Sequence, residues 1–231
     1  AQRRGAERAW QRLTYSAAAP QVDAATQWLL DLQRPGATVM VLSGNSLEHG
    51  MLELAAMQAH MPYAPITPAY AAMAGDLSRL KAMAALLEPA VVFVQSARAL
   101  EPAIRALGDD AWVVCVQDLI DRPRLITWDR LVQTPVTASV GASVASITHD
   151  TVAKYQFTSG STGTPKAVIV TQGMLCTAMA MTSQMVQWGD DRPETVLLDW
   201  LPWSHVAGGH AVFNGVLEDG GTLYIDDGRP T

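Results

Sequence analysis

The sequence alternates between short apolar runs and longer segments in which apolar residues recur at helical spacing. Continuous apolar runs are typical of buried parallel strands, because both faces of such a strand are covered. Apolar positions three or four residues apart indicate one face of a helix. The predicted strands are 38–42, 62–66, 90–94, 112–116, 151–157, 167–170, 196–199 and 222–225. The predicted helices are 22–32, 46–60, 77–87, 97–107, 172–187 and 208–217.

The order of these segments favours an α/β fold with doubly wound, mostly parallel sheets flanked by helices. Right-handed crossovers would place helices on both faces of such a sheet. Residues 133–146 are rich in Ala, Ser, Val and Thr, and they fit either a linker or a small helix. We expect a first α/β subdomain over 1–150, with a linker near 133–150, and the start of a second over 151–231.

Composition and charge narrow the classes of function. Of the 231 residues, 49% are hydrophobic and 16% are charged, which is enough for a sizeable core. The net charge of −6 argues against a nucleic-acid partner, because binding the phosphate backbone needs clustered basic residues. Four early arginines are predicted to form a solvated face rather than a basic binding patch: Arg3, Arg4, Arg8 and Arg12.

The cysteines and the hydropathy pattern predict a cytoplasmic protein. Cys115 lies in an apolar run far from Cys176, so a buried thiol is favoured over a disulfide or a metal ligand. Free thiols suit a reducing compartment. No apolar run reaches the roughly 20 residues that span a bilayer. The first residues show no signal-peptide pattern either.

The segment most informative about function is a loop rich in hydroxyl groups and glycine between two predicted strands. Glycine lets the backbone approach an anion closely, and successive backbone N–H groups can form a concave anion site. Hydroxyls donate to phosphate oxygens, and a lysine adds positive charge. The pattern favours a polyphosphate-binding loop over an ordinary surface loop. Its residues are Thr158, Ser159, Gly160, Ser161, Thr162, Gly163, Thr164, Pro165 and Lys166.

Other loop motifs do not fit this segment. A Walker A loop has glycine immediately before the lysine and Ser or Thr after it. Here two residues separate Gly163 from Lys166, and Ala167 follows the lysine. The dinucleotide fingerprint G-x-G-x-x-G and the nucleophile elbow G-x-S-x-G are both absent from the segment. A P-loop phosphotransferase is therefore a weak alternative.

The loop resembles the phosphate-binding signature of the adenylate-forming superfamily, which includes acyl- and aryl-CoA synthetases, adenylation domains of peptide synthetases and luciferases. The family usually has glycine where this chain has Ala167. Four further blocks resemble the family in order and spacing: 13–15, 35–46, 64–68 and 201–208. The segments 198–209 and 220–228 are most similar to feruloyl-CoA synthases.

The resemblance implies a reaction in two steps. A carboxylic acid, expected to be a hydroxycinnamate such as ferulate, attacks the α-phosphate of Mg-ATP and yields acyl-adenylate and pyrophosphate. Coenzyme A then displaces AMP. The resemblance implies Lys166 and His205 as catalytic residues and 158–166 as the nucleotide-binding loop. It places His205 in the acyl pocket, and a purely structural histidine is the alternative.

Several expectations concern what accompanies the loop. His205 and His210 lie near no carboxylate or thiol that completes a metal set, so no protein metal site is predicted and Mg²⁺ is expected with ATP. The family's adenine, ribose and adenylation-lysine segments are expected beyond Thr231. We therefore expect an N-terminal fragment without the C-terminal domain, inactive alone. The alternative is a truncated, non-catalytic nucleotide- or acyl-binding module. A homodimer is an open expectation.

The remaining aromatic and histidine residues are expected to be mainly structural. Trp188 and Trp200 are expected in the core, whereas Trp203 has an equal chance of contacting the pocket because it precedes His205 by two residues. His49 and His60 fall in or beside a predicted helix, where they are expected to be structural or solvent-facing.

Overall fold

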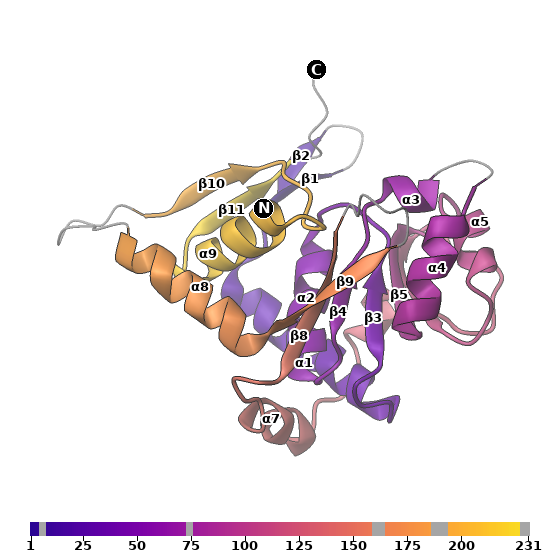
Figure 1. Ribbon diagram of the computed structural model, residues 1–231, viewed down its shortest axis with the longest axis horizontal. Helices are drawn as coiled ribbons and strands as arrows, with labels where there is room; N and C mark the ends of the chain where they lie inside the picture. The colour runs from indigo at the N-terminus through magenta and orange to yellow at the C-terminus, as the bar shows by residue number, and fades with distance from the viewer. Residues whose placement is uncertain (5–7, 73–75, 159–164, 186–193, 227–231) are drawn as a thin grey trace.

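The computed structural model describes residues 1–4, 8–72, 76–158, 165–185 and 194–226. Within them the strands form a seven-stranded sheet, in the order β7-β6-β5-β3-β4-β8-β9, and a four-stranded sheet, in the order β10-β11-β1-β2 (Figure 1). The strands are β1 (Gln2–Arg4), β2 (Ala9–Gln11), β3 (Thr38–Val41), β4 (Tyr63–Pro65), β5 (Pro89–Ser96), β6 (Trp112–Gln117), β7 (Leu125–Thr127), β8 (Val152–Thr158), β9 (Lys166–Thr171), β10 (Val196–Asp199) and β11 (Thr222–Ile225). The helices are α1 (Tyr15–Asp31), α2 (Leu47–Gln58), α3 (Ala69–Ala72), α4 (Ser78–Leu87), α5 (Glu101–Ala106), α6 (Trp128–Leu131), α7 (Ala138–Ala145), α8 (Gln172–Met185), α9 (Phe213–Glu218) and the π-helix η1 (Ala207–Val212).

The seven-stranded sheet is parallel from β7 to β8, and only its last pair, β8 and β9, is antiparallel. Its apolar runs are buried on both faces. Val39 and Val41 pack with α1 and α2, whereas Met40 packs with α4 and α5. Figure 1 shows these helix pairs on opposite sides of the sheet. The α/β fold with parallel strands flanked by helices is confirmed.

Local side-chain contacts set the helix boundaries. Thr14 caps α1 by accepting a hydrogen bond from the backbone N–H of Ala17, and Ser46 caps α2 in the same way. The helix predicted over 97–107 is shorter. The N–H groups of Ala97 and Arg98 donate to the carbonyls of Gln117, the last residue of β6, and of Asp118, the residue after it, so these N–H groups are not part of the helix. The segment 133–146 contains the helix α7, which settles the choice left open there.

The four-stranded sheet joins distant parts of the sequence. β1 pairs antiparallel with β2 and parallel with β11, and β10 pairs parallel with β11. The sequence pattern did not predict β1 or β2. It also missed β7, α3 and α6. Within the described residues, each sheet contains strands from both sides of residue 150.

The solvated face predicted for the early arginines is wrong for Arg4. Its guanidinium makes a two-pronged contact with the buried carboxylate of Glu48 at the start of α2, with 2.7 Å between Nη1 and Oε1. Arg3 stacks over the ring of Trp10, with 4.8 Å from its Cζ to the ring centroid. The Arg4 contact attaches the hairpin of β1 and β2 to α2, and the Arg3 contact joins the two strands of the hairpin.

Other residue-level expectations have mixed outcomes. Cys115 is a buried free thiol, as predicted. Trp200 is wrong as a core residue, because 61% of it is exposed, whereas Trp203 is buried. Trp188 lies outside the described residues. His49 is buried and structural rather than solvent-facing. No helix of the described chain is both long and apolar enough to cross a membrane.

Candidate functional site

The ends of the predicted phosphate loop lie side by side. Thr158 is the last residue of β8 and Lys166 is the first of β9, and the two are direct partners in the antiparallel pair. Both are exposed. Because β8 runs parallel to β4, the connection leaves the sheet at the carboxyl end of parallel strands, where α/β sheets place their ligands. The predicted residues Ser159, Gly160, Ser161, Thr162, Gly163 and Thr164 lie outside the described part of the chain, and Pro165 directly precedes β9.

His205 lies in the connection between β10 and η1. It is exposed, its backbone N–H donates to the carbonyl of Pro202, and its own carbonyl accepts from the N–H of Gly209. Asn45, in the turn before α2, fixes the start of this connection. Its amide donates to the carbonyl of Leu201 at 2.8 Å and accepts from the N–H of Trp203 at 2.9 Å. The segment that carries the predicted pocket histidine is therefore attached to the turn between β3 and α2.

A close backbone approach requires glycine next to His205. A Cβ at Gly208 would lie 2.6 Å from the carbonyl oxygen of Leu201, which no side chain tolerates. A Cβ at Gly209 would collide with the carbonyl of Trp203. The helix predicted over 208–217 begins as the π-helix η1, and π-turns of this kind often occur at functional sites.

Strand β8 carries two buried polar side chains beneath this segment. The amide of Gln156 donates to the carbonyl of Ser204, immediately before His205. The ammonium of Lys154 lies 3.3 Å from the position that a Cβ of Gly209 would occupy. The strand that leads into the predicted phosphate loop thus also donates a hydrogen bond at one end of the segment 204–209 and places an ammonium beside the other end.

The ammonium of Lys154 belongs to a buried polar cluster. It lies 3.5 Å from Oε1 of Glu53 on α2 and 5.2 Å from the ring centroid of Tyr63. Burial raises the pKa of the Glu53 carboxyl, and the nearby Lys154 charge and the Tyr63 hydroxyl oppose that rise. Burial also raises the pKa of Tyr63, with Glu53 adding to the effect.

Two histidines beside this cluster are held neutral. Burial lowers the pKa of His49 to about 4, against the opposing effect of the Gly44 carbonyl that its Nδ1 contacts at 2.9 Å. Its Nε2 contacts the hydroxyl of Tyr63. Burial and the Lys154 charge lower the pKa of His210 to about 4 as well. His210 therefore carries no positive charge at neutral pH.

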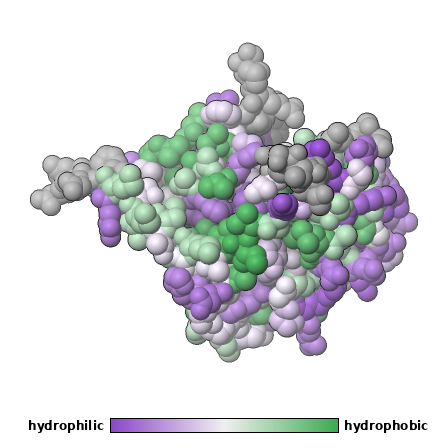
Figure 2. Space-filling view, viewed as in Figure 1, coloured by the Kyte–Doolittle hydropathy of each residue, from purple (hydrophilic) through white to green (hydrophobic). Residues whose placement is uncertain are grey.

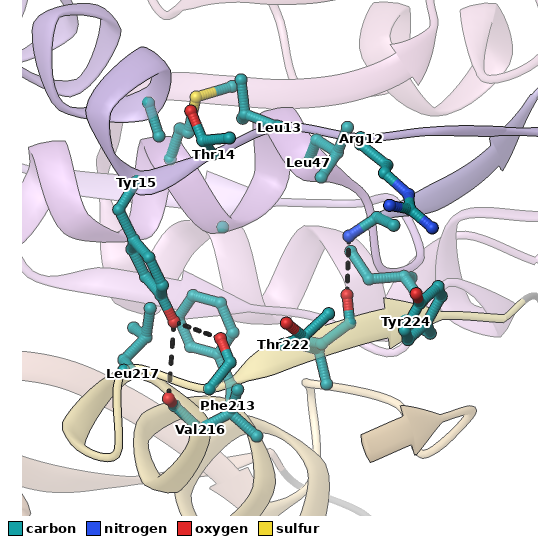
Figure 3. Close-up of a pocket in the computed structure, with 18 of the residues that line it drawn as sticks. Arg12, Leu13, Thr14, Tyr15, Leu47, Phe213, Val216, Leu217, Thr222 and Tyr224 are labelled. Carbon is teal, nitrogen blue, oxygen red and sulfur yellow. Dashed lines mark hydrogen bonds between the residues drawn. The ribbon is translucent and has the colours of Figure 1, made fainter. Parts of the chain in front are cut away.

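A separate cavity of about 620 Å³ lies between α1, α2, α9 and β11 (Figure 3). Tyr15 crosses it and donates its hydroxyl to the carbonyl of Gly221 at 2.8 Å. Its walls are mostly apolar, with Leu13, Leu47 and Phe213 among them. Trp203 borders the cavity, but Thr158, Lys166 and His205 do not. The cavity is therefore separate from the site predicted from the sequence and does not support that prediction.

Sequence reasoning missed Asn45, Lys154 and Gln156. The last two had a readable signal, since polar residues at alternate positions of an otherwise apolar strand share one face. Asn45 had no such signal, because its partners lie in a segment far along the chain.

Among the described residues, no group of three or more His, Cys, Asp and Glu side chains is arranged to hold a metal ion.

Comparison with known proteins identifies the family. The family model described as AMP-binding enzyme matches residues 2–231, so the chain belongs to the AMP-binding enzymes, which are adenylate-forming enzymes. A nonribosomal peptide synthetase from Penicillium fellutanum is 29% identical over 174 residues, which cover 74% of this chain and 6% of that protein.

Solved structures of this family share the fold. ATP-bound MatB from Rhodopseudomonas palustris is 19% identical with a TM-score of 0.70, and the match covers 95% of this chain and 41% of that one. The o-succinylbenzoate CoA synthetase of Bacillus subtilis, in complex with its acyl-adenylate, is 16% identical with a TM-score of 0.71, covering 95% and 40%. The chain thus spans about two fifths of the length of these structures.

Proposed function

We propose that this chain forms part of an enzyme that uses ATP to convert a carboxylic acid into an acyl-adenylate. The main support is that strand β8 contacts both parts of the predicted site, the hydroxyl-rich loop and the segment that carries His205. Its carboxyl end, paired at Thr158 and Lys166, opens the hydroxyl-rich loop, and its buried Gln156 holds the segment that carries His205. The relative MatB was solved with ATP, and the synthetase from Bacillus subtilis was solved with an acyl-adenylate.

The proposed roles follow from charge and position. Lys166 and the hydroxyls of 158–164 would bind the phosphates of Mg-ATP and stabilise the pyrophosphate that leaves. His205 would contact the acid near the new acyl–phosphate bond. Coenzyme A is the proposed acceptor, and its thiol would replace AMP with formation of a thioester.

The proposed acid is a hydroxycinnamate such as ferulate. The similarity of segments 198–209 and 220–228 to feruloyl-CoA synthases motivates this choice. Ala207 is exposed near His205, whereas Gly208 and Gly209 pack against the carbonyls of Leu201 and Trp203 and leave no room for a ring at their own positions. A rigid ring loses less conformational freedom on binding than a flexible acyl chain.

Carboxylate-dependent exchange of pyrophosphate into ATP tests the adenylation step, with the protein made from its complete reading frame. Lys166→Ala should lower the exchange rate about 10- to 1000-fold, because one preorganised charge contact is lost. The matched control is Lys81→Ala, which removes an exposed lysine on α4 and should leave exchange unchanged. Wild-type exchange by Lys166→Ala would refute the role of Lys166.

The acid and the extent of the active protein need separate measurements. The value of kcat/KM should be higher for ferulate than for benzoate, acetate or palmitate, and a preference for palmitate or acetate would overturn the substrate while leaving adenylation intact. Residues 1–231 alone should form no thioester from ATP, Mg²⁺, coenzyme A and hydroxycinnamates. Thioester formation by that fragment would show that it holds the whole active site.

A further inference from the structure

The buried face of β8 carries polar groups that the proposed chemistry does not use directly. Lys154 and Gln156 are both buried and lie on the same face, toward α2 and the segment 204–209. Burying an amide or an ammonium is unfavourable unless it gains a partner. Each of these side chains therefore needs a structural or functional reason to be where it is.

Gln156 makes one defined contact. Its Nε2 donates to the carbonyl of Ser204, while its Oε1 is buried without a hydrogen-bond partner in the described structure. Thr67, after β4, adds a second tie, since its hydroxyl donates to that of Ser204 at 3.4 Å. The residue before His205 is thus held to the end of the seven-stranded sheet by its backbone and by its side chain.

Lys154 lies beside the other end of the segment. Its ammonium is 3.3 Å from the position that a Cβ of Gly209 would occupy, and the N–H of Gly209 closes the turn back to the carbonyl of His205. Glu53 lies 3.5 Å from this ammonium. The hydroxyl of Tyr63 lowers the pKa of this carboxyl against the effect of burial, and it contacts Nε2 of His49, while Oε2 of Glu53 has no hydrogen-bond partner in the described structure. A chain of buried polar groups therefore runs from α2 to the floor of η1.

A buried ion pair is a poor source of stability. Removing two charges from water costs about as much as their attraction returns, and apolar replacements of such pairs are often neutral or stabilising. Stability alone therefore does not account for Lys154 and Glu53. Their position at the joint between β8 and η1 indicates a geometric role.

We propose that Lys154 and Gln156 are positioning residues that fix the segment 204–209 relative to Thr158 at the carboxyl end of β8. Both lie on the strand that ends at Thr158, so the placement of the segment is set from one element, through the hydrogen bond of Gln156 to Ser204 and the packing of the Lys154 ammonium beside Gly209. The inference rests on the proposed function, because it concerns how the carboxylic acid is aligned with ATP.

The inference predicts a separation between binding of ATP and reaction of the acid. In the proposed function the loop binds ATP, so the KM for ATP should stay close to the wild-type value when the positioning contacts are lost. Alignment of the reacting groups depends on the segment, and small displacements reduce rates by about 100-fold. The rate of acid-dependent exchange should therefore fall about 10- to 100-fold.

Two variants of the complete protein test this. Gln156→Leu removes the amide contact at similar volume, and the double variant Glu53→Leu/Lys154→Met replaces the ion pair with apolar groups. The control Gln117→Leu makes the first change at an exposed position of β6. The double variant should melt no lower than wild type and still lose exchange, which a purely structural pair would not do. Because the two variants act on different contacts, either one decides the question if the other does not fold.

The outcomes are distinguishable. Folded variants that keep wild-type kcat and KM would overturn the inference and leave the proposed function standing. A fall in exchange that tracks a rise in the KM for ATP would also overturn it, because the loop rather than the segment would then be affected. A wild-type protein without acid-dependent exchange would refute the proposed function itself, whatever the variants do.

Discussion

The two sheets of the molecule differ in how they are stabilised. In the seven-stranded sheet, β3 and most of β5 are buried on both faces, and helices cover each side. In the four-stranded sheet, three of the four residues of β10 are exposed. The first sheet is held by apolar burial among neighbouring segments. The second is held by pairing between distant segments and by a few polar ties.

The difference explains where apolar surface remains. Figure 2 shows hydrophobic side chains gathered around β10 and over β9. Val196 and Leu198 of β10 are 59% and 56% exposed, and Ile169 of β9 is 56% exposed. Both strands are the outermost of their sheets among the described residues. Apolar residues on these edges contribute little to the core, whereas those of β3 and β5 form it.

The largest expected effect contrasts the two sheets directly. Phe93 on β5 is fully buried, so Phe93→Ala should lower the free energy of unfolding by about 3–5 kcal/mol through lost burial and the cavity left behind. Leu198→Ala on β10 should change it by less than about 0.5 kcal/mol. Urea denaturation of both variants measures this. Equal losses would contradict the contrast.

The second-largest effect is expected from acid, which should destabilise the region where His49 on α2 packs against Trp203. The pKa of His49 is about 4 when folded and about 6.5 when unfolded, so only the unfolded chain gains a proton between these values. The free energy of unfolding should therefore fall by about 3 kcal/mol as the pH drops from 6.5 to 4. Glu53 acts in the opposite direction, because burial raises its pKa.

Urea denaturation across this pH range, in wild type and His49→Asn, isolates the histidine from Glu53. The variant should be less stable at neutral pH, because the ring contacts with Gly44 and Tyr63 are altered. It should also lose less stability on acidification, because its unfolded chain binds one proton fewer. The same acid slope in both proteins would show that His49 is not the group that titrates.

The parts of the fold that were predictable from the sequence are those with local causes. Strands such as 38–42 and 90–94 were found because burial on both faces makes every residue apolar. β1 and β2 were missed because each has only three residues, and they form strands by pairing with each other and, for β1, with β11. Long-range pairing leaves no periodic signal in such short segments.

The candidate site divides in the same way. The phosphate loop could be predicted because residue types of this kind bind phosphate through neighbouring backbone N–H groups and hydroxyls, and so leave a local pattern in the sequence. The role of His205 came only through a family resemblance, since a lone histidine has no motif of its own. Asn45 was invisible as a site residue, because its contacts to Leu201 and Trp203 exist only once the chain is folded. Gln156 could be read from the sequence only as a polar position in an apolar strand, since its contact to Ser204 also needs the folded chain.

A smaller effect is expected at the tie between the sheets. Asn45→Ala removes two hydrogen bonds to the 201–203 connection and leaves their partners partly buried. The free energy of unfolding should fall by about 1–3 kcal/mol. The control Asn214→Ala on α9 removes an amide whose buried Nδ2 has no partner in the described structure, so it should lose less. A greater loss for Asn214→Ala would contradict the assigned tie.

A charge on the edge strand β10 should have the smallest effect on the free energy of unfolding, but a clear effect on the association of chains. β10 is an edge strand with exposed apolar side chains, and such edges pair with other chains unless charge or cover prevents it. Residues 1–231 alone should therefore self-associate at high concentration. Leu198→Lys places a charge on this edge at an exposed position, so the free energy of unfolding should change by less than about 0.5 kcal/mol.

Sedimentation velocity over a range of concentrations measures the association. The weight-average mass of Leu198→Lys should stay closer to that of a monomer than the mass of the wild-type chain does. The control Leu119→Lys makes the same change at an exposed leucine after β6, away from the four-stranded sheet, and should associate as wild type does. If both lysine variants dissociate equally, net charge rather than the β10 edge controls association. If neither does, the chains meet through another surface, and the exposed face of β9 is then the next to test, because it too is an uncovered edge.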